Sequence, residues 1–366
     1  MLRASDCKAS PTDVIEFELS TTSGVIALVN LQVQIDGLQR QAAAGGLPAV
    51  SDQAELIDLV ALRGQILGHI SDYEWAEERA ERLTHDAPTE GSAFVARART
   101  RSIFHRFTDA LADLDRAQQL GADPTVVDTE RANIFQAIGR YEPALTIYTE
   151  AAKHRADFNS LGAFATLHAE RGDIDVAEQL FDESRGRYCG VSPFPLALLD
   201  FRRGLMWLAQ GELHQALIWF SAAVRRLPAY APAQGHLAEV EAALDKPEAA
   251  IARLRPLTTS SDDPDYAASL SRILGEVGRI EEALEWRNRA AARYNELLAR
   301  HPEAFADHAA EFWLEAGADP QRALRFARMN LEIRQTPRAH KLLTRATLAT
   351  EDACGIKETC HADIQR

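Results

Sequence analysis

The sequence predicts an all-α fold, a superhelical solenoid of paired helices, from three observations. Alanines recur about every 34 residues, at spacings of 34, 34, 33, 39, 34, 33 and 40: Ala76, Ala110, Ala144, Ala177, Ala216, Ala250, Ala283 and Ala323. Counting back 12 from each alanine gives a small residue in seven of eight cases. Counting back five gives a helix-ending glycine at four of them, Gly139, Gly172, Gly211 and Gly278. A 34-residue period indicates helix–turn–helix repeats.

Residues 1–50 are expected to hold an irregular N-terminus and one amphipathic helix. The helix should begin after the Ser/Thr-rich run at residues 20–23 and end near Ala44, before the breaker Gly45-Gly46. Its apolar residues recur at spacings of three and four, and they are Val25, Leu28, Leu31, Ile35 and Leu38. Two interpretations stay open: the helix caps the first repeat, or it docks a partner or a second copy of the chain.

Residues 51–350 should form the solenoid, with eight helical pairs and a last helix over residues 338–350 that covers the open apolar end. Residues 351–366 are expected to be a loosely ordered tail. Two insertions interrupt the period. One is a Gly/Pro-rich loop at residues 186–195, either a contact loop or a packed bend. The other lengthens a second helix from residue 281 to about 300, where Trp286 and Tyr294 should pack.

The spacing of Gly211, Ala216 and Pro228 resembles the core of the tetratricopeptide repeat (TPR) superfamily, and residues 110–117 read like the second helix of such a repeat. The resemblance covers roughly residues 57–337. It implies a right-handed superhelix of about eight TPR repeats with N- and C-terminal capping helices. It also implies that the first helix of each pair lines the concave face, through positions 2, 5, 9 and 12 of each repeat.

Nine residues at those inward positions are the expected peptide-binding site. The first three repeats supply groups that can hydrogen-bond a peptide backbone, namely Gln65, Arg99, Ser102, Thr129, Asn133 and Gln136. The fifth repeat supplies an apolar anchor surface of Phe201, Leu205 and Leu208. The Lys/Asn carboxylate clamp with which some TPR domains bind chaperone C-termini is missing from the matching positions. Arg99 is the expected charge anchor.

A ladder of arginines occupies position 7, just before the small residue of helix A: Arg63, Arg97, Arg131 and Arg203. Two interpretations compete. The arginines form ion pairs within the repeats, as the placement of Asp113 opposite Arg97 favours, or they bind an anion, since guanidinium groups recognise carboxylates bidentately.

The composition narrows the class of function. The 366 residues include 40 Lys+Arg and 54 Asp+Glu, a net charge of −14, which argues against nucleic acid as a partner. No apolar stretch could span a membrane, and the charged N-terminus does not resemble a signal peptide. Four cysteines without a C-x-x-C pair suggest a cytoplasmic protein with reduced thiols; Cys354, Cys360 and His361 are only a weak metal candidate. We expect no cofactor and no metal.

The sequence lacks a phosphate-binding loop, G-x-S-x-G and H-E-x-x-H, so no enzyme activity is expected. It predicts a non-catalytic scaffold or adaptor that binds a peptide segment of a partner protein in its concave groove. The partners are expected to be proteins or peptides, with no membrane insertion and a possible homodimer through the N-terminal helix. Two alternatives remain: a peptide-signal sensor whose superhelix changes on binding, and an accessory subunit of an enzyme complex.

Overall fold

The computed structural model describes residues 20–43 and 49–364, with side chains for residues 20–42 and 49–353. This part contains 18 α-helices and no strand, and none of the helices is long and apolar enough to cross a bilayer. The expectations for residues 1–19, for the Gly45-Gly46 break and for the side chains of Cys7, Cys354, Cys360 and His361 lie outside the described residues.

Sixteen helices form the eight predicted pairs, flanked by α1 (Gly24–Ala43) and α18 (Pro337–Ile364). The pairs are α2 (Val50–Leu67) with α3 (Ile70–Asp86), α4 (Gly91–Ile103) with α5 (Phe107–Gln119), α6 (Pro124–Ala137) with α7 (Tyr141–Arg155), α8 (Phe158–Arg171) with α9 (Ile174–Gly186), α10 (Phe194–Ala209) with α11 (Leu213–Arg226), α12 (Ala231–Ala243) with α13 (Pro247–Ser260), α14 (Asp265–Glu276) with α15 (Ile280–Arg300), and α16 (Pro302–Leu314) with α17 (Pro320–Ile333). The predicted all-α array of helical pairs is confirmed.

Small residues hold the two helices of each pair together. All eight repeat alanines are buried, and a Cβ atom added to Gly204 would lie 2.6 Å from the Phe220 ring. The four predicted turn glycines have φ angles of 82°, 85°, 77° and 81°, a region that residues with a Cβ atom rarely adopt. The spacing of small residues therefore reflects close helix contact and tight turns within each pair.

The position-7 arginines are bound to carboxylates. Arg97 makes a bidentate ion pair with Asp113 of its own repeat (2.7 and 3.0 Å). Arg63 pairs in the same way with Asp72, while Arg203 bonds Glu178 of the preceding repeat and stacks 3.9 Å from the Trp219 ring. These contacts fit the interpretation that the ladder joins helices within and between repeats.

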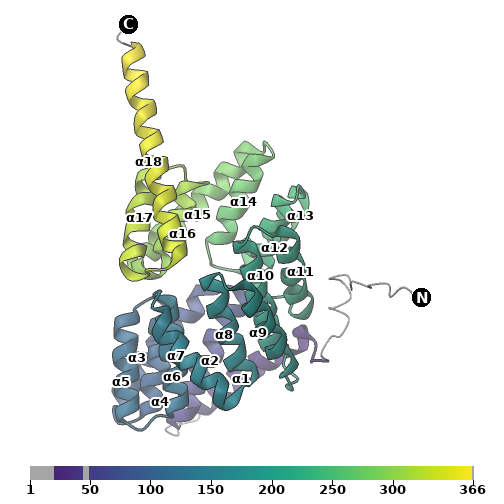
Figure 1. The fold of residues 1–366 in the computed structure, drawn as a ribbon, viewed down its shortest axis with the longest axis vertical. Coiled ribbons are helices and arrows are strands. Elements are labelled where there is room, and N and C mark those ends of the chain that lie inside the picture. The colour runs from purple at the N-terminus through teal and green to yellow at the C-terminus, as the bar shows by residue number, and fades with distance from the viewer. Residues whose placement is uncertain (1–19, 44–48, 365–366) are drawn as a thin grey trace, which may run out of the picture.

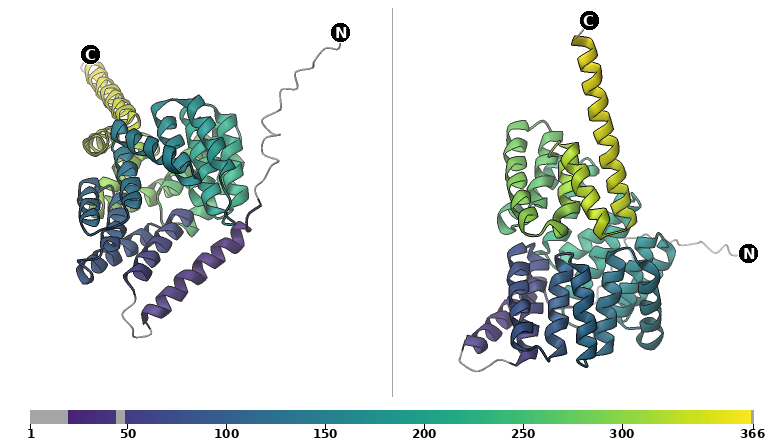
Figure 2. Two further views of the ribbon diagram at one scale, coloured as in Figure 1. Left: turned by 60° about the horizontal axis from the view of Figure 1, so that its bottom comes forward. Right: turned by 90° about the vertical axis from the view of Figure 1, so that its left-hand side faces the viewer.

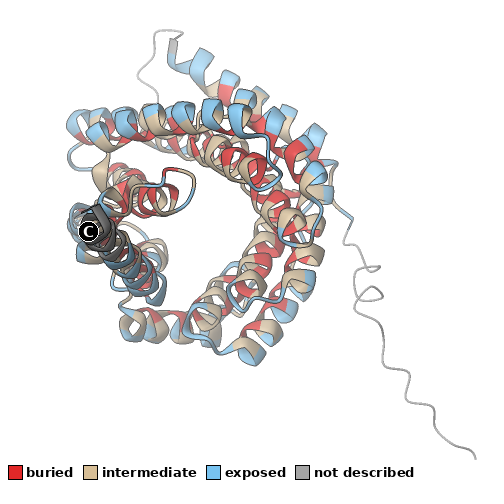
Figure 3. Ribbon diagram, turned by 90° about the horizontal axis from the view of Figure 1, so that it is seen from above, coloured by how far each residue is buried: buried red, intermediate tan, exposed pale blue. Residues whose placement is uncertain are grey.

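The superhelix winds until its last pairs lie against its first ones, as Figures 1 and 2 show for α14–α18 beside α2–α7. The carboxylate of Asp262 accepts hydrogen bonds from the backbone N–H groups of Ile70 (2.5 Å) and Ser71 (3.0 Å) at the start of α3. The backbone N–H of Gln335 donates to the carbonyl of Ile138 (3.0 Å). Hydrogen bonds between residues almost 200 positions apart therefore join successive turns around the central axis seen in Figure 3.

Helix α1 packs against distant repeats as well as the first. Leu31 and Ile35 are buried in one cluster with Val60 of α2 and with Leu227 and Tyr230 of the α11–α12 turn. The opposite side of α1 leaves four valines and isoleucines 55–63% exposed: Val25, Ile26, Val29 and Val33. The buried face of α1 thus lies against the first helical pair and against the turn that joins the fifth pair to the sixth. Val25, although part of the predicted apolar stripe, is not on this buried face.

The C-terminal and inserted segments differ in part from expectation. Helix α18 starts as predicted but continues past Thr350 to Ile364, through residues expected to be loosely ordered, and its end stands clear of the other helices (Figure 1). Helix α15 runs to Arg300 as predicted, and Tyr294 on it is 1% exposed. In the insertion loop, the Tyr188 hydroxyl donates to the Ser192 carbonyl and its ring packs edge-on against Phe158, as in a packed bend.

A half-exposed ion pair between α14 and α16 makes stability depend on pH. His308 Nδ1 lies 2.6 Å from the Asp265 carboxylate, whose charge raises the pKa of His308 well above its usual value. A raised histidine pKa stabilises the fold fully below about pH 6.5 and loses that effect as the pH rises through the folded-state pKa. We expect the unfolding free energy of the wild type to fall between pH 7 and 9 more than that of His308→Gln. Urea titrations at both pH values measure this, and equal slopes would contradict it.

Candidate functional site

Two adjoining cavities lie among the first helices of the repeats and share Leu62 and Gln65 of α2. The first, here called the Arg99 cavity, has a volume of about 500 Å³ and is lined from α2–α6 by Asp58, Ala61, Leu62, Gln65, Tyr73, Arg99, Ser102, Ile103, His105, Phe107, Glu130, Asn133, Ile134 and Ala137. The second, the Arg202 cavity, has about 310 Å³ and lies between α2, α8 and α10. Together they form the candidate binding site.

Charges in the Arg99 cavity are neutralised among themselves. Arg99 donates to Glu130 (2.7 Å) and to Asp58 (2.5 Å), so the three side chains carry one net negative charge when both acids are ionised. Burial raises the pKa of Asp58. Burial also lowers the pKa of His105 to about 4, so that this histidine is neutral at pH 7. Arg99 is therefore a paired group that offers little free charge to an anionic ligand.

Four of the nine predicted site residues meet in this cavity: Gln65, Arg99, Ser102 and Asn133. Ser102 donates to the Ala98 carbonyl (2.8 Å), and Asn133 accepts from the Tyr148 hydroxyl (2.7 Å). The carboxamide of Gln65 makes no hydrogen bond to any described residue. Gln65 is thus the polar group of the cavity that is most available to a ligand.

The other five predicted residues line neither cavity. The Thr129 hydroxyl donates to the Thr125 carbonyl, and Gln136 is buried and donates to Glu170 (2.9 Å). The three predicted apolar residues pack between helices. The Phe201 ring contacts the rings of Phe220 and Tyr230, and Leu205 and Leu208 pack against the same core cluster. The Arg99 cavity therefore contains four of the predicted polar residues, whereas the predicted apolar residues pack between helices.

The Arg202 cavity is lined mainly by apolar residues, and Arg202 is the charged side chain in its lining. Its lining residues come from α2, α8, the insertion loop, α10 and the α11–α12 turn: Leu62, Gln65, Ile66, Phe158, Asn159, Gly162, Ser192, Phe194, Pro195, Leu198, Leu199, Arg202, Leu227 and Tyr230. The insertion places Ser192 and Phe194 in this wall, so the packed bend also helps to build the site.

Sequence reasoning missed three charged residues of the site: Asp58, Glu130 and Arg202. Asp58 occupies position 2 of its repeat, an inward position in the TPR frame. Glu130 and Arg202 both occupy position 6, which lies four residues after position 2 and three before position 9 and so shares their helix face. Adding position 6 to the inward set would have found both residues.

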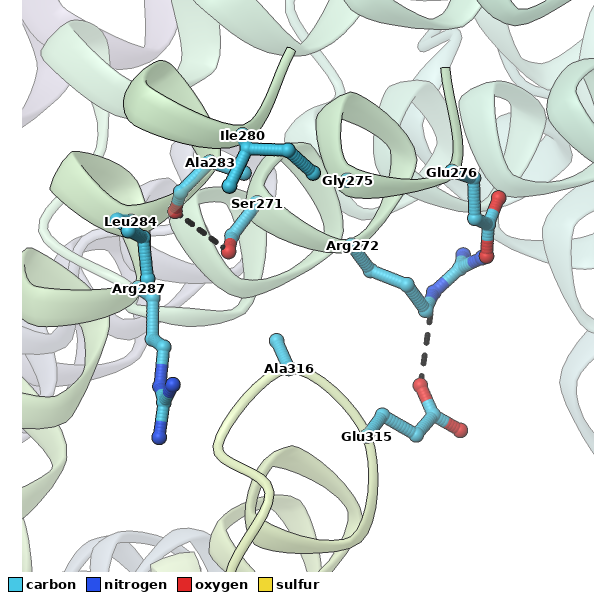
Figure 4. Close-up of a pocket in the computed structure, with 10 residues that line it drawn as sticks. All are labelled: Ser271, Arg272, Gly275, Glu276, Ile280, Ala283, Leu284, Arg287, Glu315 and Ala316. Atoms are coloured by element: carbon cyan, nitrogen blue, oxygen red, sulfur yellow. Dashed lines mark hydrogen bonds and ion pairs between the residues drawn. The ribbon is translucent and has the colours of Figure 1, made fainter. Parts of the chain in front are cut away.

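A third hollow of about 570 Å³ lies between α14, α15 and the α16–α17 turn (Figure 4). Arg272 pairs there with Glu276 (2.9 Å) and Glu315 (3.5 Å), and Arg287 donates to the carbonyl of Gly317. It holds none of the predicted site residues. Among the described residues, no group of three or more His, Cys, Asp or Glu side chains could hold a metal ion.

Comparison with known proteins rests on structure, because no protein-family model and no curated protein matches the sequence. The chain is similar to human IFIT1 solved as a dimer with PPP-AAAA, at 14% identity over 88% of this chain and 77% of that one, with a TM-score of 0.54. The IFIT1 dimer with m7Gppp-AAAA matches at 15% identity over 87% and 77%, with a TM-score of 0.53. A tetratricopeptide repeat protein from Parabacteroides merdae matches at 16% identity over 67% and 93%, with a TM-score of 0.41.

The exclusion of nucleic acid as a partner is wrong, because proteins of similar fold are solved with RNA ends, PPP-AAAA and m7Gppp-AAAA. The physical error was to argue from the net charge of −14, which sums over the whole chain and does not describe the charge of one local surface. Many of the carboxylates behind that number lie on second helices, where they pair with arginines, as Asp113 and Glu178 do. By fold, the chain is a TPR-like helical-repeat superhelix.

Proposed function

We propose that the chain is a non-catalytic interaction scaffold that binds an extended segment of a partner protein in the Arg99 cavity. One observation carries the proposal: three helices, α2, α4 and α6, bring Gln65, Ser102 and Asn133 to one cavity, and the Gln65 carboxamide has no hydrogen-bond partner among the described residues. A carboxamide both donates and accepts, so it can pair with the alternating N–H and C=O groups of an extended backbone.

The chemistry of the cavity supports binding rather than catalysis. Its charged side chains, Asp58, Arg99 and Glu130, are engaged with one another, and the neutral His105 has its Nδ1 3.1 Å from the Glu303 carbonyl. No pair of described side chains there combines a nucleophile with a base within hydrogen-bond reach. The net negative charge favours segments that are neutral or basic over acidic ones.

Replacing Gln65 and Asn133 together by Ala should remove the partner protein while the fold is kept. Both amides border the cavity and neither takes part in an ion pair. Because Asn133 also accepts a hydrogen bond from the buried Tyr148 hydroxyl, the melting temperature of the variant is measured alongside. Affinity purification from the native host after in-cell cross-linking, read by mass spectrometry, measures the loss. The matched control is Gln179→Ala with Asn288→Ala, two exposed amides outside the cavities, and it should retain the partner.

The other outcomes each reject this assignment in a different way. A partner retained by the double variant would place binding outside the Arg99 cavity, as for an accessory subunit held by α1 or the convex face. An RNA recovered in place of a protein would make nucleic acid the ligand, as in the IFIT1 structures. A small peptide recovered with a change in scattering radius would identify a sensor.

A further inference from the structure

We infer that the Arg202 cavity is a binding site for a carboxylate attached to a compact apolar group. The cavity shares Leu62 and Gln65 with the Arg99 cavity, but Arg202 lines only the Arg202 cavity. The inference rests on one cation without a partner, on the apolar surface in front of it, and on the absence of a second cation in the lining.

Arg202 differs from the other arginines of similar burial. Every other half-buried arginine in the described residues makes an ion pair or a hydrogen bond; Arg99, Arg203 and Arg226, for example, all contact carboxylates. Arg202 makes neither with any described residue. A partly desolvated guanidinium without a counter-ion is unfavourable, and an anion that paired with it would remove this cost and gain two charge-assisted hydrogen bonds.

The wall in front of Arg202 is apolar and built from separate repeats. Ile66 of α2, Phe158 of α8, and Phe194 and Leu198 of α10 surround a space of about 310 Å³. That volume is at the lower end for small-molecule sites, which span about 300–1,000 Å³. It suits an aliphatic chain or one aromatic ring, whose burial supplies affinity while the arginine fixes its orientation.

A single arginine selects a carboxylate over a phosphate-rich ligand. The cavity lining holds no other Lys, Arg or His residue, and one guanidinium matches the two oxygens of a carboxylate. The carboxylate could belong to a free organic acid or to the C-terminal residue of a peptide.

Calorimetric titration of the full chain tests the site with octanoate and with a pentapeptide that ends in phenylalanine with a free carboxylate. Octanol and the amidated pentapeptide are the neutral counterparts. We expect at least one of the two acids to bind and its neutral counterpart to bind far more weakly. Arg202→Gln should lower the affinity for that acid by about tenfold to a hundredfold. Arg202→Lys should retain part of the affinity, because the charge remains but the bidentate geometry is lost.

The matched control is Arg225→Gln, which removes the same charge from an exposed position on α11. It should bind the acid like the wild type. Binding of octanoate alone identifies a free acid as the ligand, and binding of the peptide acid alone identifies a chain terminus. The inference is overturned if neither acid binds, if octanol binds as tightly as octanoate, if Arg202→Gln keeps full affinity, or if only a phosphate-ended oligonucleotide binds through Arg202.

Discussion

Replacing Asp200 by Ala is expected to destabilise the fifth helical pair by about 3–5 kcal/mol, the usual result of removing one partner of a buried ion pair. The Asp200 side chain is 1% exposed and pairs with Arg185 of α9 and with Arg226 of α11. Without the carboxylate, both guanidinium groups would lose their shared counter-ion, and Arg226 would stay largely buried. The effect should therefore come from uncompensated charge more than from lost packing.

Urea unfolding at pH 7, followed by tryptophan fluorescence, measures this loss. Trp219 reports on this part of the fold, because its ring lies 5.5 Å from the Arg185 guanidinium and its side chain is 8% exposed. Asp175→Ala on α9 is the matched control, an exposed aspartate that should change stability by less than about 0.5 kcal/mol. The triple variant Asp200→Leu with Arg185→Met and Arg226→Met should recover part of the loss, since apolar groups can replace a buried ion-paired cluster. A loss for Asp200→Ala as small as that of the control would contradict the argument.

The repeat frame could be predicted from the sequence because its causes are local. Two helices that cross closely need a small residue at the contact, and a tight turn needs positive φ, so alanine and glycine return with every repeat. Gly204 against Phe220 and Gly139 at its turn show these two demands in the structure. The arginine ladder was predictable in the same way, since Arg97 and Asp113 lie within one repeat.

The closure of the ring could not be predicted, because its contacts join residues that share no period. Asp262 bonds the backbone of Ile70, and Gln335 bonds that of Ile138, across separations of almost 200 residues. The same closure brings α2 beside α10 and so creates the Arg202 cavity. The repeat frame therefore brought together four residues of the Arg99 cavity, within three consecutive repeats, but it gave no sign of the Arg202 cavity, which needs the closed ring.

Replacing Ile35 by Asp should detach α1 from the first helical pair, the second large effect we expect. Ile35 is 0% exposed and lies in the buried cluster that also contains Val60, Leu227 and Tyr230, so a carboxylate there would be buried without a partner at a cost of several kcal/mol. The repeats themselves keep their neighbours, so helicity should change little. Small-angle scattering should show a larger radius of gyration, and hydrogen exchange should increase in α1 and at the α11–α12 turn.

Val33→Asp is the matched control, since Val33 lies on the same helix with 58% of its surface exposed, and it should scatter like the wild type. The comparison also shows whether α1 covers only the first helical pair or also holds the α11–α12 turn in place. If the helix only covered the first pair, exchange in Ile35→Asp would rise in α2 and α3 and leave the α11–α12 turn protected. Increased exchange at that turn, together with weaker binding of the carboxylate probe, would show that α1 holds the two walls of the Arg202 cavity together, because Leu227 and Tyr230 border both the α1 contact and the cavity.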